Sequence, residues 1–291
     1  MRTDPEMRGQ AMVGTMTETG YLSPITAIPE DAKTDYLNAM SMTLEIMGKL
    51  LIRKKEKIPN GINILGCNPA DWTDEMLQDT ECWLQSLGYQ VISRWGVTER
   101  TEALSQAASA SLNLVVNISG LRLAKYMKKE FGIRYVVGAP YGHVHCTWIQ
   151  NGLLTGGRLW SAGIGGEEEP LILFVGEQLM GNALRRVLYV KGYEGVKVAS
   201  FFEMDHSQMS PGDEKLNSQE DLKRLLNTKG LQLIIADEIY KSFLEKKVAW
   251  IHIPKQGMNH EGEYSKPDNI NLIGDCMDRW LEKELERAGF V

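Results

Sequence analysis

The chain of 291 residues carries 32 Lys and Arg against 38 Asp and Glu, a formal net charge of −6, and 43% of its residues are hydrophobic. This composition is typical of a globular protein with about two domains. The acidic balance and the lack of a long Lys/Arg run argue against nucleic-acid binding by phosphate neutralisation. No apolar run approaches the roughly 20 residues that span a bilayer, so we expect neither nucleic acid nor a membrane as a partner.

The cysteines and residues 1–19 indicate the cellular compartment in which the protein resides. The four cysteines lie far apart, with no CxxC pair: Cys67, Cys82, Cys146 and Cys276. Such spacing argues against a secreted disulfide framework in a chain of this length. The segment 1–19 is polar and lacks the apolar core of a signal peptide. We therefore expect a soluble, cytoplasmic protein.

Residues 1–58 are predicted to form an arm followed by a helix. Residues 1–34 show no periodicity and contain three prolines, which predicts an irregular arm that becomes ordered on a partner surface. Apolar residues then recur at helical spacing, namely Leu37, Met40, Leu44, Met47 and Leu51. The basic stretch 53–57 is expected to complete this helix, and Pro59-Asn60-Gly61 to end it.

Residues 59–165 are predicted to form a first Rossmann-like α/β domain. Apolar strands at 62–65, 90–95, 112–116 and 134–137 alternate with helices at 73–87, 99–111 and 121–131. Strands without polar alternation, separated by helices, are typical of a parallel sheet that is covered on both faces. The glycine-rich segment 156–169 is expected to be a hinge or linker.

The alternation restarts in residues 166–291, which predicts a second Rossmann-like domain with a C-terminal helix. The expected strands are 171–175, 196–201, 231–236 and 248–253, and the expected helices are 178–189, 218–226, 238–244 and 270–287. The predicted fold class is therefore α/β, with two tandem doubly wound parallel sheets and helices on both faces of each.

The loops that follow the strands are the expected place for chemistry, because open parallel sheets bind ligands beyond the carboxyl ends of their strands. These loops are 66–69, 117–120, 138–145, 176–177 and 237–238, and the cleft between the domains is the natural site. The loop after the first strand has Pro69 and Asp71 where a dinucleotide fingerprint needs glycines. We therefore expect no NAD or ATP site.

The densest group of potential metal ligands is His143-Val144-His145-Cys146. In an extended segment His143 and His145 would share a face and reach one metal ion, whereas the alternative is two loop histidines beside a buried thiol. Cys67 follows a strand, where helix N-terminal amides would lower its thiol pKa, although a packing role is equally consistent. His252 flanks the loop before the last helix and faces the expected cleft.

Several segments in order resemble the nitrogenase component 1-type oxidoreductase family. They are INILG (62–66), LQSLGY (84–89), ASLNLV (110–115), FGIRY (131–135), PYG (140–142), FVGE (174–177), GVKVA (195–199) and IIAD (234–237). Their joint order extends the resemblance from about Asn60 to Leu285. The family includes the nitrogenase molybdenum–iron subunits, their cofactor-assembly scaffold and dark protochlorophyllide reductase.

The resemblance implies a low-potential oxidoreductase that holds an iron–sulfur or related metal cluster, or a substrate, between its domains. It also implies a homologous partner subunit and an ATP-dependent iron–sulfur reductase. By the same resemblance, Asn117 stands where nitrogenase proper has a cysteine ligand, and a histidine ligand would fall near 252–256. No cysteine precedes Gly66, where the family's first domain supplies several, so we expect a truncated or divergent member.

The leading hypothesis is an oxidoreductase subunit that transfers low-potential electrons to a cluster or substrate in the interdomain cleft. The residues assigned to this site are Cys67, Asn117, His143, His145, Cys146 and His252, of which Cys67, His143, His145 and Cys146 are the candidate metal ligands. One alternative is a non-catalytic assembly or binding protein without its own cluster. A second alternative is a two-domain small-molecule binder or transferase that shares the architecture by convergence.

Overall fold

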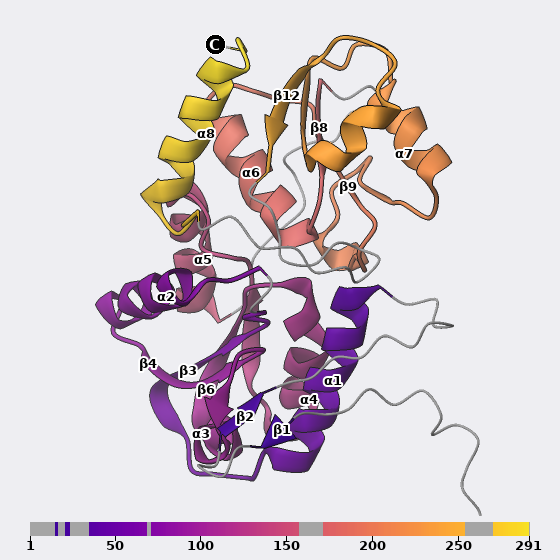
Figure 1. Ribbon diagram of the computed structural model, residues 1–291. Coiled ribbons are helices and arrows are strands. Elements are labelled where there is room, and N and C mark those ends of the chain that lie inside the picture. The colour runs from indigo at the N-terminus through magenta and orange to yellow at the C-terminus, as the bar shows by residue number, and fades with distance from the viewer. Residues whose placement is uncertain are drawn as a thin grey trace, which may run out of the picture.

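The computed structural model describes residues 15–16, 21–23, 35–68, 71–156, 171–253 and 270–290. Two α/β domains lie one above the other, the first indigo to magenta and the second salmon to yellow (Figure 1). Each is built on its own parallel sheet, which confirms the predicted fold class. Within these ranges, no helix is long and apolar enough to cross a membrane.

The first sheet has the strand order β4-β3-β6-β7, and all its neighbours are parallel. Its strands are β3 (Ile58–Leu65), β4 (Gln90–Trp95), β6 (Ala110–Val115) and β7 (Arg134–Val137). Ile62 and Ile64 pack on one face and Leu65 packs on the other, because successive strand side chains alternate. The first face is covered by α2 (Asp74–Ser86) and α5 (His143–Thr155), and the second by α1 (Tyr36–Leu51), α3 (Thr101–Gln106) and α4 (Leu121–Phe131).

The second sheet has the order β10-β9-β8-β11-β12, again parallel throughout. Its strands are β8 (Ile172–Val175), β9 (Val196–Ser200), β10 (Glu214–Lys215), β11 (Leu233–Ala236) and β12 (Ala249–His252). One face packs against α6 (Gln178–Val190) and α8 (Asp275–Arg287), and the other against α7 (Gln219–Leu226) and the 3₁₀ helix η5 (Glu238–Phe243).

The two domains share one apolar core. A single cluster of buried side chains runs from Ile62 of β3 through α5 and α6 to Leu281 of α8. Tyr141 forms β-bridges with Ile273 and Gly274, which join the first domain to the start of α8. This continuity means that α5, α6 and α8 position the two domains relative to each other.

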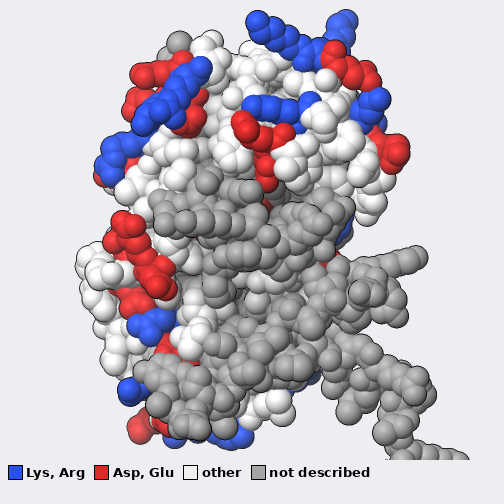
Figure 2. All heavy atoms as spheres, viewed as in Figure 1, with Lys and Arg blue, Asp and Glu red and all other residues white. Residues whose placement is uncertain are grey.

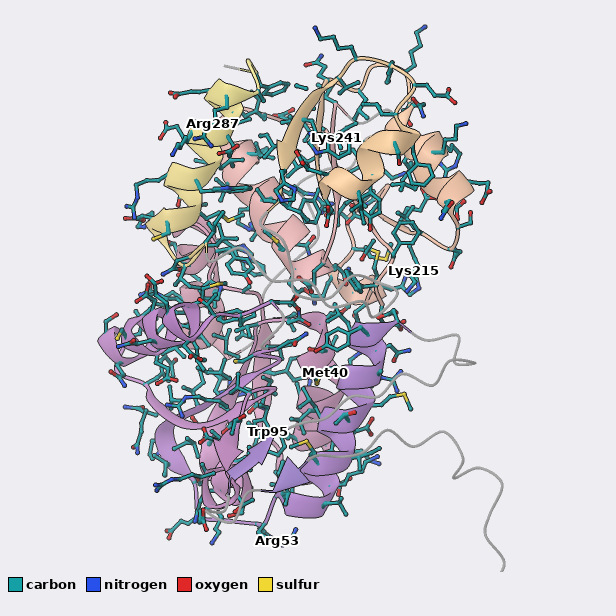
Figure 3. The ribbon with its side chains drawn as sticks, in the orientation of Figure 1. Met40, Arg53, Trp95, Lys215, Lys241 and Arg287 are labelled. Atoms are coloured by element: carbon teal, nitrogen blue, oxygen red, sulfur yellow. The ribbon has the colours of Figure 1, made fainter. Side chains whose placement is uncertain are left out.

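Ion pairs add to the domain contact. Lys125 of α4 lies 2.6 Å from the carboxylate of Asp205 in the second domain. Lys215 lies 3.3 Å from Asp35, the N-cap residue of α1, and Figure 3 places Lys215 on the side of the second domain that faces α1. Elsewhere Lys, Arg, Asp and Glu side chains are intermixed over the upper domain on the face in Figure 2.

Part of the N-terminal arm is ordered in strands, contrary to the prediction of an irregular arm. β1 (Thr15–Met16) and β2 (Tyr21–Ser23) pair antiparallel, and β2 pairs with β5 (Glu99–Arg100) of the first domain. The surface that orders this segment therefore belongs to the same chain. The predicted hinge, apart from Gly156 at the end of α5, lies outside the described residues, as does the rest of the arm.

Three predicted boundaries were wrong. The helix α1 ends at Leu51, and Pro59-Asn60-Gly61 lie within β3, where the Ser111 hydroxyl donates to the Pro59 and Gly61 carbonyls. The helix predicted at 99–111 is only α3 plus a 3₁₀ turn, because Ala110 already pairs with β3. The helix α8 starts at Asp275, since Ile273 is held in a β-bridge.

Candidate functional site

A group of polar side chains lies where the ends of three strands meet at the domain boundary. Asn68 and Asp71 follow β3, Asn117 follows β6, and Glu177 follows β8 in the other domain. Tyr36 reaches the group from the first turn of α1. We call Tyr36, Asn68, Asp71, Asn117 and Glu177 the carboxyl cluster.

Asp71 is held by two amide side chains. Its Oδ2 accepts hydrogen bonds from Asn68 Nδ2 at 3.1 Å and from Asn117 Nδ2 at 3.4 Å. The Tyr36 hydroxyl donates to Asn68 Oδ1 at 2.7 Å, which orients that amide so that its NH₂ points at Asp71. Asp71 as a whole residue is partly exposed, whereas its carboxyl group is buried.

Glu177 is the N-cap residue of α6 and is only 2% exposed. Its Oε2 accepts from the Met180 amide at 2.8 Å, as an N-cap carboxylate does. Its Oε1 accepts from the Ile118 amide at 3.2 Å, across the domain boundary. One carboxyl group therefore caps a helix of the second domain and binds the backbone of the first.

The two carboxyl groups hold protons unusually well. Burial, and secondarily the charge of Glu177, raise the pKa of Asp71 to about 8. Burial raises the pKa of Glu177 to about 7, although the Met180, Leu179 and Ile118 amides oppose that rise. The interaction between the groups makes them titrate as a pair, so near neutral pH the pair carries at least one proton.

Two tyrosines have raised pKa values around the same place. Burial raises the pKa of Tyr36, and the charge of Asp71 adds to the rise. The pKa of Tyr141 is raised by burial and, secondarily, by the charges of Glu177 and Asp71. The Tyr141 ring lies 5.8 Å from the ring of Trp72, measured between centroids. Both hydroxyls therefore stay protonated beside the carboxyls.

Comparisons with known proteins show a resemblance to one family. Residues 10–148 match the model of the nitrogenase component 1 type oxidoreductases. The resemblance to that family is confirmed. No curated protein matches the chain.

Solved structures show the same fold. The structure titled "Nitrogenase Cp1 at pH 6.5" aligns with a TM-score of 0.61 and 14% identity, over 90% of this chain and 66% of that one. "Nitrogenase Cp1 at pH 5" aligns with a TM-score of 0.54 and 14% identity, over 85% of this chain and 61% of that one. The chain thus spans somewhat less than two thirds of these nitrogenase chains.

The surroundings of Asn117 bear on the resemblance to the nitrogenase component 1 type oxidoreductases. The side-chain amide of Asn117, a residue predicted to bind a cofactor, donates to Asp71. Its Oδ1 accepts from the Ser119 amide at 2.9 Å, so the side chain is fully engaged. Of the predicted site residues, Asn117 is the one that belongs to the carboxyl cluster.

Cys67 does not have the electrostatics that the sequence suggested. It is fully buried, its amide donates to the Trp95 carbonyl at 2.9 Å, and burial raises the pKa of its thiol. The expectation of a lowered pKa is therefore wrong, because the residue lies inside the sheet edge rather than at an open helix terminus. Close packing of the Cys67 backbone against Gly96 supports a packing role.

His143, His145 and Cys146 lie on α5, so the expected extended segment is wrong. Positions two apart on a helix are separated by about 200°, so the two histidines do not share a face. His143 is exposed, and its Nδ1 lies 3.3 Å from Asp275 Oδ1.

The Cys146 thiol donates to the Pro140 carbonyl at 3.2 Å, and burial raises the pKa of this thiol to about 12. The Asp278 carboxylate of α8 accepts a hydrogen bond from the His143 amide at 2.6 Å, which places a negative charge at the N-terminus of α5.

His252 ends the edge strand β12, where its charge interacts with Glu238. Across the described ranges, no three His, Cys, Asp or Glu side chains gather into a group that fits a metal ion. Cys67 and Cys146 are buried thiols with raised pKa values, a poor starting point for thiolate ligands. The donor set of these residues therefore does not fit an iron–sulfur cluster.

The carboxyl cluster was only partly visible in the sequence. The rule that ligands bind at strand ends selected the loops that contain Asn68, Asn117 and Glu177. Asp71 lies just beyond one of these loops, and Tyr36 comes from a helix that precedes the sheet. No local signal marks either residue, because their roles depend on contacts made across the fold.

Proposed function

We propose that this chain is a nitrogenase component 1-like oxidoreductase subunit that reduces a substrate held between its two domains, beside the carboxyl cluster. The observation that carries the proposal is the coupled pair Asp71 and Glu177, whose pKa values are about 8 and about 7. Groups that exchange protons near neutral pH are suited to general acid catalysis.

The residues have separate roles in this proposal. Asp71, half-buried, donates a proton to the substrate as it gains electrons, and recovers that proton from solvent. Asn68 and Asn117 hold its carboxyl group in one orientation. Glu177, anchored by the Ile118 and Met180 amides, supplies the negative charge that keeps the proton on Asp71. Saturation of one double bond takes two electrons and two protons, so the acid acts twice.

The electrons come from outside the described residues in this proposal. By family resemblance, an ATP-dependent iron–sulfur protein delivers them, and a homologous subunit completes the assembly. No step is assigned to a cluster of this chain, since the donor set does not fit one. The cytoplasmic location predicted from composition agrees with a low-potential partner of this kind.

The test is substrate-dependent oxidation of a reduced viologen dye by the full chain, purified without oxygen with its partner proteins. A panel of unsaturated organic acids and tetrapyrroles serves as substrates. We expect Asp71→Asn to lower the rate at least about 100-fold, because Asn has the same shape but no proton to give. Asp74→Asn, on the exposed start of α2, is the matched control and should leave the rate unchanged. Equal rates for Asp71→Asn and the unaltered protein would refute the proposal.

A non-catalytic assembly or binding protein is the second candidate. The replacement of a ligand position by Asn117, engaged with Asp71 and Ser119, favours it. Such a protein would form a stable complex with a homologous subunit while the complex accepts no electrons from the dye. The same experiment therefore separates the two candidates.

A further inference from the structure

A second polar region lies at the domain boundary, between α5 and α6 and beside the end of β7. Here the surface has a hollow that opens to solvent, and its empty space, counted together with the open solvent at its mouth, is about 370 Å³. Its wall includes His145 and Trp148 from α5, and Asn182, Arg185 and Arg186 from α6. We call it the α5–α6 hollow.

Arg186 brings a positive charge to this hollow without a matching negative one. Its guanidinium carbon lies 4.2 Å from the centre of the Trp148 ring, and its Nε is buried without a hydrogen-bond partner. Burial and the neighbouring charge of Arg185 lower the pKa of Arg186 to about 10, and among the described residues no carboxylate opposes this. A partly buried guanidinium with no opposing charge among the described residues is costly for a protein to keep.

His145 is a second unsatisfied group in the same wall. It is 2% exposed, and both of its ring nitrogens are buried without a hydrogen-bond partner. Its ring stacks on Trp148, with centroids 5.0 Å apart and an angle of 19°. Burial and the charge of Arg186 lower the pKa of His145 to about 3, so the ring is neutral and offers one donor and one acceptor.

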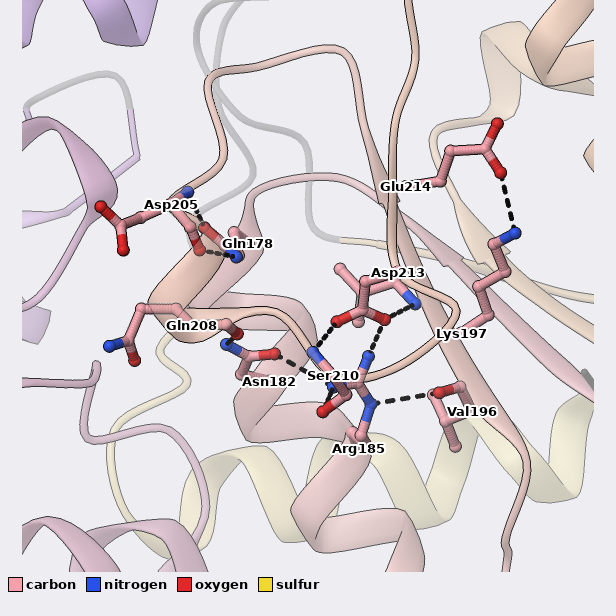
Figure 4. A network of polar contacts seen from close by, with 11 residues as sticks. Gln178, Asn182, Arg185, Val196, Lys197, Asp205, Gln208, Ser210, Asp213 and Glu214 are labelled. Carbon is pink, nitrogen blue, oxygen red and sulfur yellow. Dashed lines mark hydrogen bonds and ion pairs between the residues drawn. The ribbon is translucent and has the colours of Figure 1, made fainter. Parts of the chain in front are cut away.

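Arg185 and Asn182, two other polar residues of the wall, already have hydrogen-bond partners. The Arg185 guanidinium binds the Val196 carbonyl at 3.1 Å, the Ser210 hydroxyl at 2.6 Å and the carboxylate of Asp213 (Figure 4). Asn182 donates to the Gln208 carbonyl at 2.9 Å. Among the described residues, the positive charge of Arg186 thus has no opposing charge and the two ring nitrogens of His145 have no hydrogen-bond partner.

We propose that the α5–α6 hollow binds the carboxylate group of a small monoanionic organic acid, with Arg186 and His145 as its partners. A guanidinium edge presents parallel N–H groups that match the two oxygens of a carboxylate, and Trp148 holds that edge in place. A single positive charge neutralises a monoanion but leaves a dianionic phosphate half-paired. The inference does not depend on the proposed reductase function.

The test is a titration of the full chain, labelled with ¹⁵N at its five histidines, with sodium acetate at constant ionic strength. We expect a saturable shift of the His145 resonance, with a dissociation constant on the order of 1 mM, because acetate has few atoms to contribute. Acetamide, which has the same shape without the charge, should not shift it in the same range. Inorganic phosphate should bind at least about 10-fold more weakly.

Arg186→Gln should weaken acetate binding at least about 10-fold, since a charged hydrogen-bond donor is lost. Arg279→Gln, the same change on the exposed face of α8, is the control and should bind acetate as the unaltered chain does. If Arg186→Gln does not fold, Arg186→Lys keeps the charge without the planar edge and should bind acetate measurably more weakly. Equal binding of acetamide, tighter binding of phosphate, or an Arg186 variant that binds acetate normally would overturn the proposal.

Discussion

The carboxyl cluster and the α5–α6 hollow lie on the same domain boundary, and α6 joins them through its N-cap Glu177 and through Arg186, yet they differ in how their polar groups are hydrogen-bonded. In the cluster, Asp71 and Glu177 accept hydrogen bonds from side chains and backbone amides. In the hollow, the ring nitrogens of His145 and the Nε of Arg186 have no hydrogen-bond partner within the part of the chain that the structure describes. The comparison teaches that burial alone does not distinguish a structural polar group from a candidate ligand-binding group. The presence or absence of hydrogen-bond partners does.

The neighbours Arg185 and Arg186 repeat this contrast on one helix. Arg185 and Asp213 have 4% and 0% of their side chains exposed and form an ion pair. Burial lowers the pKa of Arg185, and the charge of Asp213 counteracts that drop. The free energy of unfolding should therefore respond strongly to a change in the Arg185 pair and weakly to a change at Arg186.

The largest expected effect comes from Asp213→Ala, which leaves the buried charge of Arg185 without its partner. We expect the free energy of unfolding to fall by about 3–5 kcal/mol, measured by urea denaturation. Lys223→Ala removes one member of an exposed pair with Glu245 and should cost less than about 1 kcal/mol. A loss at Asp213 as small as that at Lys223 would contradict the view of Arg185 as a buried, partnered charge.

The second expected effect is a pH dependence of stability caused by the carboxyl cluster. The pKa values of Asp71 and Glu177 are higher in the folded chain, at about 8 and about 7, than the usual 4 or so of an unfolded chain. Between about pH 4 and pH 8 the folded state binds more protons, so this contribution to stability is greatest at low pH and is lost as the pH rises. Asp71→Asn should remove the part of the fall in stability that comes from Asp71, which extends up to about pH 8. Above pH 8 the variant should therefore have a higher free energy of unfolding than the unaltered chain. Parallel profiles for the two proteins would show that Asp71 titrates normally.

A smaller effect is expected for Glu177→Gln, which keeps one acceptor for the Ile118 and Met180 amides and removes the charge. The free energy of unfolding should drop by about 1–2 kcal/mol. The pKa of Asp71 should fall, because the charge that raises it is gone, while burial keeps it above 4. Infrared titration of the carboxyl C=O band measures this fall, and Glu220→Gln on the exposed start of α7 is the control.

The smallest effect is expected for Arg186→Met. The change removes an unmatched charge and keeps the apolar contact with Trp148, so stability should change by less than about 1 kcal/mol or rise. Denaturation in urea, beside Arg185→Met as the comparison, measures both. A loss at Arg186 as large as that at Arg185 would mean that the guanidinium is already satisfied, which would remove the contrast between the two regions.

Much of the fold follows from local sequence. The strands β4 and β7 lie where their apolar runs predicted them, and α2 begins at the Thr73 cap and α4 ends at Gly132 as expected. These features depend on burial and on capping groups that lie within a few residues. For the same reason, the loops that carry Asn117 and Glu177 were found from the strand ends alone.

The geometry of the site is harder to predict from the sequence, as the residues of α5 illustrate. The pair His143 and His145 was expected on one face of an extended segment, and it lies on a helix whose first amide is bound by Asp278, 135 positions further along the chain. A contact over that distance leaves no periodic signal in the sequence. The carboxyl cluster depends in the same way on Tyr36, Asp71 and Glu177 meeting across two domains.

The sequence by itself thus determined the two parallel sheets, their order along the chain and the loops at their carboxyl ends, because burial of apolar strands and helix capping are local effects. Only the tertiary structure decided which polar groups meet at the domain boundary. It brings Asp71 close enough to Glu177 for the two charges to interact, and among the described residues it leaves the Nε of Arg186 and the ring nitrogens of His145 without hydrogen-bond partners. The pKa of a group and the satisfaction of its hydrogen bonds are set by neighbours in space, and packing chooses those neighbours.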